Sequence, residues 1–344
     1  MGQNQPASPL RIAILGTGGM AEAHAKALRA QSDARIVAVC GTSAGKAGDF
    51  IQQHASGAAP YDNFAAMLDA AQPDAVYITI PPFAHDGQTE LAASLGIHLF
   101  LEKPIALSSE AADHIAVVTR RAGVISQVGF CLRHGHAVRR LQAAIADGSA
   151  GRPTLFYGSY RCNSLHKDWW HERSKSGGQV YEQIVHLYDL TRFLLGEPEL
   201  VWGQIANLCH RDNPAYTIED TSIGTMRFVS GAMATIAGSN GSVPGEWRSS
   251  WSVVCERLTA HFTDCNHAEF IWHDSNTVRR EQVGQVVDVL AAETVEFLAA
   301  IRARGRTTSS VADAARSTAL VDAVIASSEA GGIPVVPRPA PGTG

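Results

Sequence analysis

The strongest constraint on the fold is a short apolar run that ends in a glycine-rich turn. Leu10–Leu15 (LRIAIL) has the composition of a buried β-strand, and the helical pattern AEAHAKALRA begins at Ala21. The turn between them, GTGGMA at residues 16–21, matches G-x-G-x-x-A. This pattern permits a tight turn, lets a pyrophosphate approach the backbone at the helix N-terminus, and lets helix and strand pack closely. The sequence therefore predicts a dinucleotide-binding turn made by Gly16, Thr17, Gly18, Gly19 and Met20.

Further apolar runs follow this turn at the spacing of βαβ units, with helical segments between them. They are RIVAVC (35–40), AVYITI (75–80), IHLFL (97–101) and VISQVG (124–129). Alternating strands and helices predict a parallel, doubly wound sheet with right-handed crossovers. We expect a Rossmann domain over residues 1–130 and a second domain over residues 131–344.

The end of the second predicted strand bears on the choice of cofactor. An acid at this point normally accepts the ribose hydroxyls of NAD, whereas this chain has CGTS at residues 40–43. No carboxylate there repels a 2′-phosphate, and Ser43 and Lys46 are close enough in sequence to bind one. The sequence favours NADP and leaves NAD open, because Lys46 is equally well explained as a solvated helix residue.

Two later loops come directly after predicted strands, where α/β proteins bind their ligands. PPFAH at residues 81–85 follows AVYITI, and EKP at residues 102–104 follows IHLFL. A lysine at the end of a strand projects into the ligand crevice, although a solvated loop lysine is the ordinary alternative. We expect cofactor contacts from Pro81, Pro82, His85, Glu102 and Lys103.

The second half of the chain changes to alternating apolar and polar residues. The runs TLFYGSYR, LVWGQIANL, TSIGTMRFV, AMATIAG, WSVVCERLTAHF and AEFIWHD predict strands of a mostly antiparallel sheet, followed by helices over 287–304 and 311–330. An apolar outer face of such a sheet has to be covered by another subunit. We therefore expect a homodimer or homotetramer.

One helical stretch in this half combines a buried face with an ionisable one. In SGGQVYEQIVHLYDLTRFLLGEP (176–198), a period of 3.6 residues places Glu182, His186 and Asp189 on a common face. This face is either a solvated surface or part of a site. A metal ion shared by the three side chains is an alternative that chelation would test.

Aromatic residues close to this stretch suggest contacts with a sugar, because indole rings suit the C–H faces of sugars and indole N–H groups can bind hydroxyls. Tryptophan is equally often a core residue, so both explanations stay open. The predicted substrate residues are the aromatic Trp169, Trp170 and Tyr160, together with Arg133.

Composition excludes several other classes of protein. The 28 Lys plus Arg against 33 Asp plus Glu give a net charge of −5 with no basic block, so nucleic acid is not an expected partner. No apolar run reaches the roughly 20 residues that span a bilayer, and the first residues do not resemble a signal peptide. Six scattered cysteines without a CxxC pair indicate reduced thiols and no zinc site. We expect a cytoplasmic protein without a metal.

Taken together, the motifs resemble those of the Gfo/Idh/MocA family, named for glucose-fructose oxidoreductase and inositol dehydrogenase. The matching segments span most of the chain and keep their order and spacing. They are GTGGMA (16–21), TIPPFAH (79–85), LEKP (101–104), VGFCLRH (128–134), WW (169–170) and SGGQVYEQIVHLYDLTRFLLGE (176–197).

This resemblance implies an N-terminal Rossmann domain, a C-terminal domain on a large and mostly antiparallel open sheet, and Lys103 and His186 as the catalytic pair. The family commonly has Asp four residues before this histidine and Gly two before it, where this chain has Glu182 and Ile184. The implied reaction is hydride transfer between NAD(P) and a secondary alcohol or ketone of a sugar, cyclitol or related polyol. A catalytically silent sugar sensor and an NAD-dependent glycosidase are the alternatives.

Overall fold

The computed structural model describes residues 8–165, 167–273 and 278–339, which form two compact units. Unit 1 contains the described residues up to Ile105, together with Asp113–Gly129 and Leu290–Asp313. Unit 2 contains Ala106–Ala112, Phe130–Val289 and the described residues from Ala314 onward. Each unit is built around one β-sheet.

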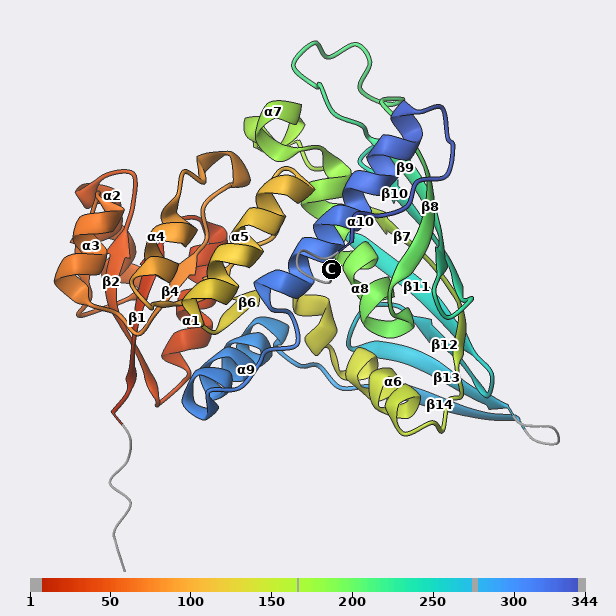
Figure 1. Ribbon diagram of the computed structural model, residues 1–344, viewed down its shortest axis with the longest axis horizontal. Helices are drawn as coiled ribbons and strands as arrows, with labels where there is room; N and C mark the ends of the chain where they lie inside the picture. Colours follow the sequence, from red (N-terminus) through yellow and green to blue (C-terminus); the bar gives the residue numbers. More distant parts are fainter. Residues whose placement is uncertain (1–7, 166, 274–277, 340–344) are drawn as a thin grey trace, which may run out of the picture. The chain divides into compact units, whose positions relative to one another are not determined.

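The sheet of unit 1 has six parallel strands in the order β3-β2-β1-β4-β5-β6 (Figure 1). This is the strand order of a Rossmann fold, so the predicted doubly wound parallel sheet is confirmed. The short β3 was not predicted, because its three residues include a proline and show no periodic pattern. The strands are β1 (Leu10–Leu15), β2 (Ala34–Cys40), β3 (Ala59–Tyr61), β4 (Ala75–Ile78), β5 (His98–Leu101) and β6 (Ser126–Val128).

The core of unit 1 includes a helix from the far end of the sequence. Tyr77 of β4 and Phe100 of β5 stack with ring centroids 4.4 Å apart, and Phe297 lies edge-on to both rings at 5.7 Å. Phe297 belongs to α9, so residues that follow unit 2 in the sequence complete this core. The helices are α1 (Gly19–Arg29), α2 (Ala44–His54), α3 (Phe64–Ala71), α4 (Gln88–Ser94), α5 (Ser109–Ala122) and α9 (Val289–Ala303), with Ser109–Ala112 and Val289 assigned to unit 2.

The sheet of unit 2 has eight strands in the order β14-β13-β12-β11-β7-β10-β9-β8. All neighbours are antiparallel except β7 and β10, which confirms the predicted mostly antiparallel sheet. The run WSVVCERLTAHF is divided between two strands, and β14 was not predicted. The strands are β7 (Pro153–Arg161), β8 (Pro198–Ala206), β9 (Thr221–Phe228), β10 (Met233–Ser239), β11 (Arg248–Cys255), β12 (Leu258–Phe262), β13 (His267–His273) and β14 (Val278–Gly284).

Helices cover one face of this sheet (Figure 1). A Cβ on Gly224 of β9 would lie 2.2 Å from the hydroxyl oxygen of Tyr188, and one on Gly203 of β8 would lie 2.1 Å from the carbonyl oxygen of Val324. These two glycines therefore permit the close approach of two helices to the sheet. The helices of unit 2 are α6 (His136–Ala146), α7 (Arg173–Ser176), α8 (Val185–Leu195) and, from Ala314 onward, α10 (Val311–Glu329).

The opposite face of the sheet keeps several large apolar side chains exposed within unit 2. Along β9 and β10, buried and exposed residues alternate strictly. Ile223 is 54% exposed, Met233 56% and Tyr157 43%. This outer face mixes these groups with Thr225, Arg227 and other polar residues, so it is only partly apolar.

Candidate functional site

The predicted dinucleotide turn in unit 1 has the geometry that a phosphate needs. Gly16 has a φ of 115°, and a Cβ there would lie 2.5 Å from the hydroxyl oxygen of Thr79, so only glycine fits. Helix α1 begins at Gly19. A Cβ on Gly18 or Gly19 would meet no atom within 4 Å, so the surface above these residues is open. The residues present fit a dinucleotide whose phosphates rest on the N-terminus of α1.

Helix α2 begins at the end of β2 on the same edge of the sheet. The Ser43 hydroxyl accepts a hydrogen bond from the backbone N–H of Lys46, so Ser43 caps the helix. Both residues are exposed, and the first turn contains no acid. An acid does lie nearby, because Gly41 N–H donates to the carbonyl of Tyr61, the residue before Asp62. Sequence reasoning missed Asp62, because the pairing of β3 with β2, and not the order of residues, brings it near the end of β2.

The loop after β4 carries the predicted residues Pro81, Pro82 and His85. Pro82 is buried, whereas Pro81 and His85 are half-buried. Burial lowers the pKa of His85, against smaller opposing effects from the Ile80 carbonyl and the Glu90 carboxylate. His85 is therefore neutral near pH 7, and the structure places it at the carboxyl edge of the sheet, as predicted.

The EKP segment follows β5 at the same edge. Lys103 is half-buried, but Glu102 is only 7% exposed. The Glu102 carboxylate is held by His24 Nε2 at 2.7 Å and by the backbone N–H of Lys103 at 3.2 Å. These two contacts occupy it inside the protein, so the structure does not support Glu102 as a direct cofactor contact.

In unit 2 the segment around His186 is not one regular α-helix. Residues Val180–Ile184 form a π-helical turn that leads into α8. Between residues 178 and 192, every side chain is buried except those of Glu182 and His186. The local fold therefore directs these two ionisable groups, and no others from this stretch, to an accessible surface. π-Turns inside helices often mark functional sites.

The start of this segment is anchored by a buried carboxylate. Glu219 accepts hydrogen bonds from Val180 N–H at 2.8 Å and from the Arg173 guanidinium at 2.8 Å. Gly178 has a φ of 112°, and a Cβ there would lie 2.5 Å from Glu219 Oε2. Burial raises the pKa of Glu219, although Val180 and Arg173 act in the opposite direction. Sequence reasoning missed Glu219, which lies 39 residues beyond the amide that it holds.

Arg133 and Asp189 have a different role from the one predicted. Both side chains are 2% exposed and form a two-point ion pair, with Nε–Oδ2 at 2.7 Å and Nη2–Oδ1 at 2.5 Å. The Ser317 hydroxyl also donates to Asp189 at 2.8 Å. The guanidinium is thus enclosed by protein, so the structure does not support Arg133 as a substrate residue. Asp189 likewise does not share an accessible face with Glu182 and His186.

Aromatic groups lie near Glu182 and His186. Phe130 lies edge-on to the His186 ring, with centroids 6.1 Å apart. Burial raises the pKa of Tyr160, and the nearby groups Cys162, Glu182 and Cys131 raise it further. The Glu182 carboxylate is thus among the charged groups that act on the Tyr160 hydroxyl.

The two predicted tryptophans lie in a short 3₁₀ helix, Asp168–His171. Trp169 and Trp170 pack edge to face at 5.7 Å, and both are half-buried. Partial burial is compatible both with contact to a sugar and with packing in the core, the two explanations that the sequence left open.

A hollow in unit 2 involves residues that sequence reasoning did not select. It is lined by Asn163, Leu165, Pro244, Gly245 and Trp247, and the indole of Trp247 is 49% exposed. The adjacent Ser164 hydroxyl accepts a hydrogen bond from Gln183, the residue after Glu182. This hydrogen bond connects the loop of the hollow to the π-helical turn.

The described part of the chain contains a single group of three side chains with the spacing of metal ligands. It consists of His24, Glu102 and Glu293, all of them buried in unit 1. A metal held by Glu182, His186 and Asp189 is not supported, because the Asp189 carboxylate is paired with Arg133.

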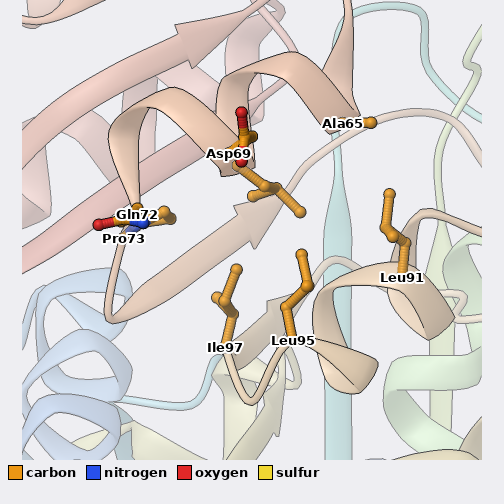
Figure 2. Close-up of a pocket in the computed structure, with 8 residues that line it drawn as sticks. Ala65, Asp69, Gln72, Pro73, Leu91, Leu95 and Ile97 are labelled. Carbon is orange, nitrogen blue, oxygen red and sulfur yellow. The ribbon is translucent and has the colours of Figure 1, made fainter.

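The groove drawn in Figure 2 lies at the opposite edge of the unit 1 sheet. Leu91 of α4 and Leu95, the residue that follows α4, point towards α3, which carries Asp69. Ile97 directly precedes β5, so the groove lies at the amino ends of the strands. The candidate cofactor residues all lie at the carboxyl ends, and this groove is separate from them.

In the described segments, no helix is both long and apolar enough to span a membrane.

Comparison with known proteins agrees with this geometry. Residues 10–130 match the model of an oxidoreductase family with an NAD-binding Rossmann fold, and residues 138–261 match a GFO/IDH/MocA C-terminal domain. These two matches define a two-domain, NAD-binding oxidoreductase. The chain belongs to the Gfo/Idh/MocA family, as its motifs suggested.

Individual relatives are distant. D-glucoside 3-dehydrogenase of Escherichia coli K12 is 26% identical over 244 residues, which cover 66% of this chain and 69% of that protein. 1,5-Anhydro-D-fructose reductase of Ensifer adhaerens is 34% identical over 165 residues, 47% of this chain and 49% of that protein. Levoglucosan dehydrogenase in complex with NADH and L-sorbose has a TM-score of 0.89 at 17% identity, covering 96% of this chain and 99% of that chain. At this identity the similarity establishes the fold alone.

Proposed function

We propose that the protein transfers a hydride between NAD(P) and a secondary alcohol or ketone of a sugar, cyclitol or related polyol. One observation carries the proposal beyond family membership. The buried helical segment of unit 2 leaves only Glu182 and His186 accessible, and the other side chains between residues 178 and 192 are enclosed. A histidine and a carboxylate at neighbouring positions suit the deprotonation and binding of a hydroxylated substrate.

In the proposed reaction, His186 takes the hydroxyl proton of the substrate as the alkoxide develops. Histidine suits this step because its unperturbed titration lies nearest to neutral pH. Lys103 donates a hydrogen bond to the same oxygen and stabilises its negative charge. A dinucleotide held at Gly16–Met20 and the N-terminus of α1 would supply the hydride chemistry. In the reverse direction, His186 returns the proton to the carbonyl oxygen.

Substrate hydroxyls beside the reacting carbon require further polar groups. We assign Glu182 to a neighbouring hydroxyl or to the orientation of His186. Tyr160 and the indole faces of Trp169 and Trp170 are assigned to the sugar ring.

For the cofactor, the start of α2 supports the proposal of NADP. Its exposed N-terminus carries Ser43 and Lys46 without an acid in the first turn. Asp62 acts in the opposite direction and favours NAD, because a carboxylate repels a 2′-phosphate. The balance between Lys46 and Asp62 therefore sets the preference.

We also propose that a second copy of the chain covers the outer face of the unit 2 sheet, giving a homodimer or homotetramer. Ile223 and Met233 on this face are more than half exposed. Replacing both residues with aspartate is expected to dissociate the assembly, as measured by light scattering. The described cysteines are free thiols, which fits the cytoplasmic location expected from the sequence.

The test is a panel of sugars and polyols assayed with NAD and NADP side by side. Product analysis accompanies nicotinamide absorbance, so that a glycosidase with internal cofactor recycling is recognised by release of its leaving group. Once a substrate is known, His186→Ala and Lys103→Ala are each expected to lower turnover by about 100-fold or more. Near wild-type turnover in both folded variants would refute the assignment. Sugars that raise the melting temperature but never change absorbance would indicate a sensor.

A further inference from the structure

The buried cluster of His24, Glu102 and Glu293 lies behind the candidate cofactor edge and has no role in the chemistry described so far. Its ligand-capable atoms all lie within 4.8 Å of one another. His24 comes from α1, Glu102 from the end of β5 and Glu293 from α9. Ionisable groups in a protein core are costly unless they are paired, so a cluster of this kind calls for an explanation.

The central contact is the hydrogen bond between His24 Nε2 and Glu102 Oε1, at 2.7 Å. The His24 side chain is fully buried, and that of Glu102 is 9% exposed. Two aromatic rings fix the imidazole in place, Phe100 edge-on at 4.7 Å and Tyr77 at 5.3 Å. His24 therefore has little freedom to move away from Glu102.

The Glu102 carboxylate also holds the backbone of the next residue, because its Oε2 accepts the N–H of Lys103 at 3.2 Å. Gly129, at the end of β6, leaves the space that the carboxylate occupies. A Cβ on Gly129 would lie 2.9 Å from Glu102 Oε1. Glu102 is thus held by His24 of α1 and by the peptide of Lys103, in the space that Gly129 leaves open.

The helix that carries His24 begins at the dinucleotide turn. Helix α1 starts at Gly19, five residues before His24, and its N-terminus is where the phosphates are expected. A rigid helix therefore joins the phosphate site to His24, and one hydrogen bond joins His24 to the residue before Lys103.

We propose that His24 and Glu102 are positioning residues, which hold Lys103 at a fixed place relative to the dinucleotide-binding turn. This inference rests on the proposed catalytic role of Lys103. When the link is broken, the lysine amine loses its alignment while the cofactor site keeps its shape. The rate of the chemical step then falls, and affinity for the cofactor does not.

Three variants of the full chain separate positioning from simple stabilisation. Glu102→Gln keeps the size of the side chain but offers one acceptor oxygen to the two donors. His24→Phe keeps a ring among the aromatic neighbours and removes the hydrogen bond. Tyr77→Phe is the matched control, because it removes the buried contact of Tyr77 with Thr294 in the same core and leaves the peptide of Lys103 untouched.

The direct measurement is hydrogen exchange at the Lys103 amide, read by mass spectrometry of the peptide that contains it. Glu102→Gln and His24→Phe are expected to speed this exchange by at least about tenfold, and Tyr77→Phe is expected to leave it unchanged. In single-turnover assays, the first two variants lose about 100-fold in rate with cofactor Kd within about twofold of wild type. The double variant is no slower than either single one, because both changes break the same link.

Unchanged exchange at Lys103 in both variants would overturn the inference, whatever happens to activity. A stoichiometric metal ion in the purified protein, lost in Glu102→Gln, would also overturn it and identify a metal site. Faster exchange together with full activity of Lys103→Ala would confirm the mechanical link and refute the proposed function of the lysine instead.

Discussion

Replacing Asp189 with asparagine tests whether Arg133 belongs to the protein core or to the substrate. Both side chains of the pair are 2% exposed, and two hydrogen bonds of 2.5 and 2.7 Å join them. Asparagine keeps the shape of the side chain but leaves the guanidinium charge buried without its counter-charge. Breaking one partner of a buried ion pair costs about 3–5 kcal/mol. This is a large part of the free energy of unfolding of a typical domain, about 5–15 kcal/mol.

The assay is urea unfolding followed by tryptophan fluorescence. Asp189→Asn is expected to lower the unfolding midpoint strongly, whereas the double variant Arg133→Met/Asp189→Leu recovers most of the loss, because an apolar pair of similar volume carries no buried charge. Glu256→Gln is the control, since its partner Arg152 is exposed in the same unit and no shift of the midpoint is expected.

A loss below about 1 kcal/mol in Asp189→Asn would contradict the reasoning, since that is the value of an exposed pair. Substrate binding supplies a second criterion. If Arg133 contacts the sugar, the folded double variant shows a raised KM. If the pair is purely internal, KM stays at the wild-type value.

Further substitutions test other parts of the structure. Gly178→Ala is expected to destabilise unit 2 by more than Gly231→Ala. Both glycines have a positive φ, 112° at Gly178 and 84° at Gly231, but only a Cβ on Gly178 would collide with the buried carboxylate of Glu219. Equal losses in thermal unfolding would argue against Glu219 as the anchor of this segment. Lys46→Ala is expected to lower kcat/KM with NADP by about tenfold relative to NAD, and Asp62→Asn to raise the same ratio; a ratio that moves in neither variant would remove both from cofactor choice. Burial lowers the pKa of His134 from 6.5 to about 3. As the pH falls, this histidine therefore becomes protonated in the unfolded chain before it does so in the folded protein. The contribution of neutral His134 to the free energy of unfolding is fully present above about pH 6.5, and it falls towards pH 3 by at most about 1.4 kcal/mol per pH unit. His134→Asn should reduce this pH dependence, as measured by urea titrations at pH 6 to 4.

The parallel sheet was predictable because its strands are short apolar runs separated by helical patterns, with a glycine turn after the first. The antiparallel sheet was predictable from alternation along strands such as β9. The division between β11 and β12 was missed, because ERL continues the alternating pattern while the chain turns at Glu256 and Arg257. Local pattern thus identified strands better than it identified their ends.

The candidate site was less predictable, because its details depend on contacts between residues distant in sequence. His24 and Glu102 are 78 residues apart, and Arg133 and Asp189 are 56 apart. A 3.6-residue period also placed Asp189 beside His186. The π-helical turn, which that period does not encode, precedes both residues of α8, and Asp189 is buried because it pairs with Arg133. The positions of Glu182 and His186 on an accessible face agree with the prediction, and their catalytic roles stay predictions.

The contribution of α9 to unit 1 has a consequence for how the protein is made. Phe297, Leu298 and Ile301 pack in the same core as Ile12 and Tyr77, although more than 200 residues separate them. Once residue 130 has emerged from the ribosome, all six strands of the parallel sheet are outside it, but the helix that closes this core is not. The nascent Rossmann sheet therefore waits with apolar surface exposed until almost the whole chain has emerged, which makes it a natural client for a chaperone during synthesis.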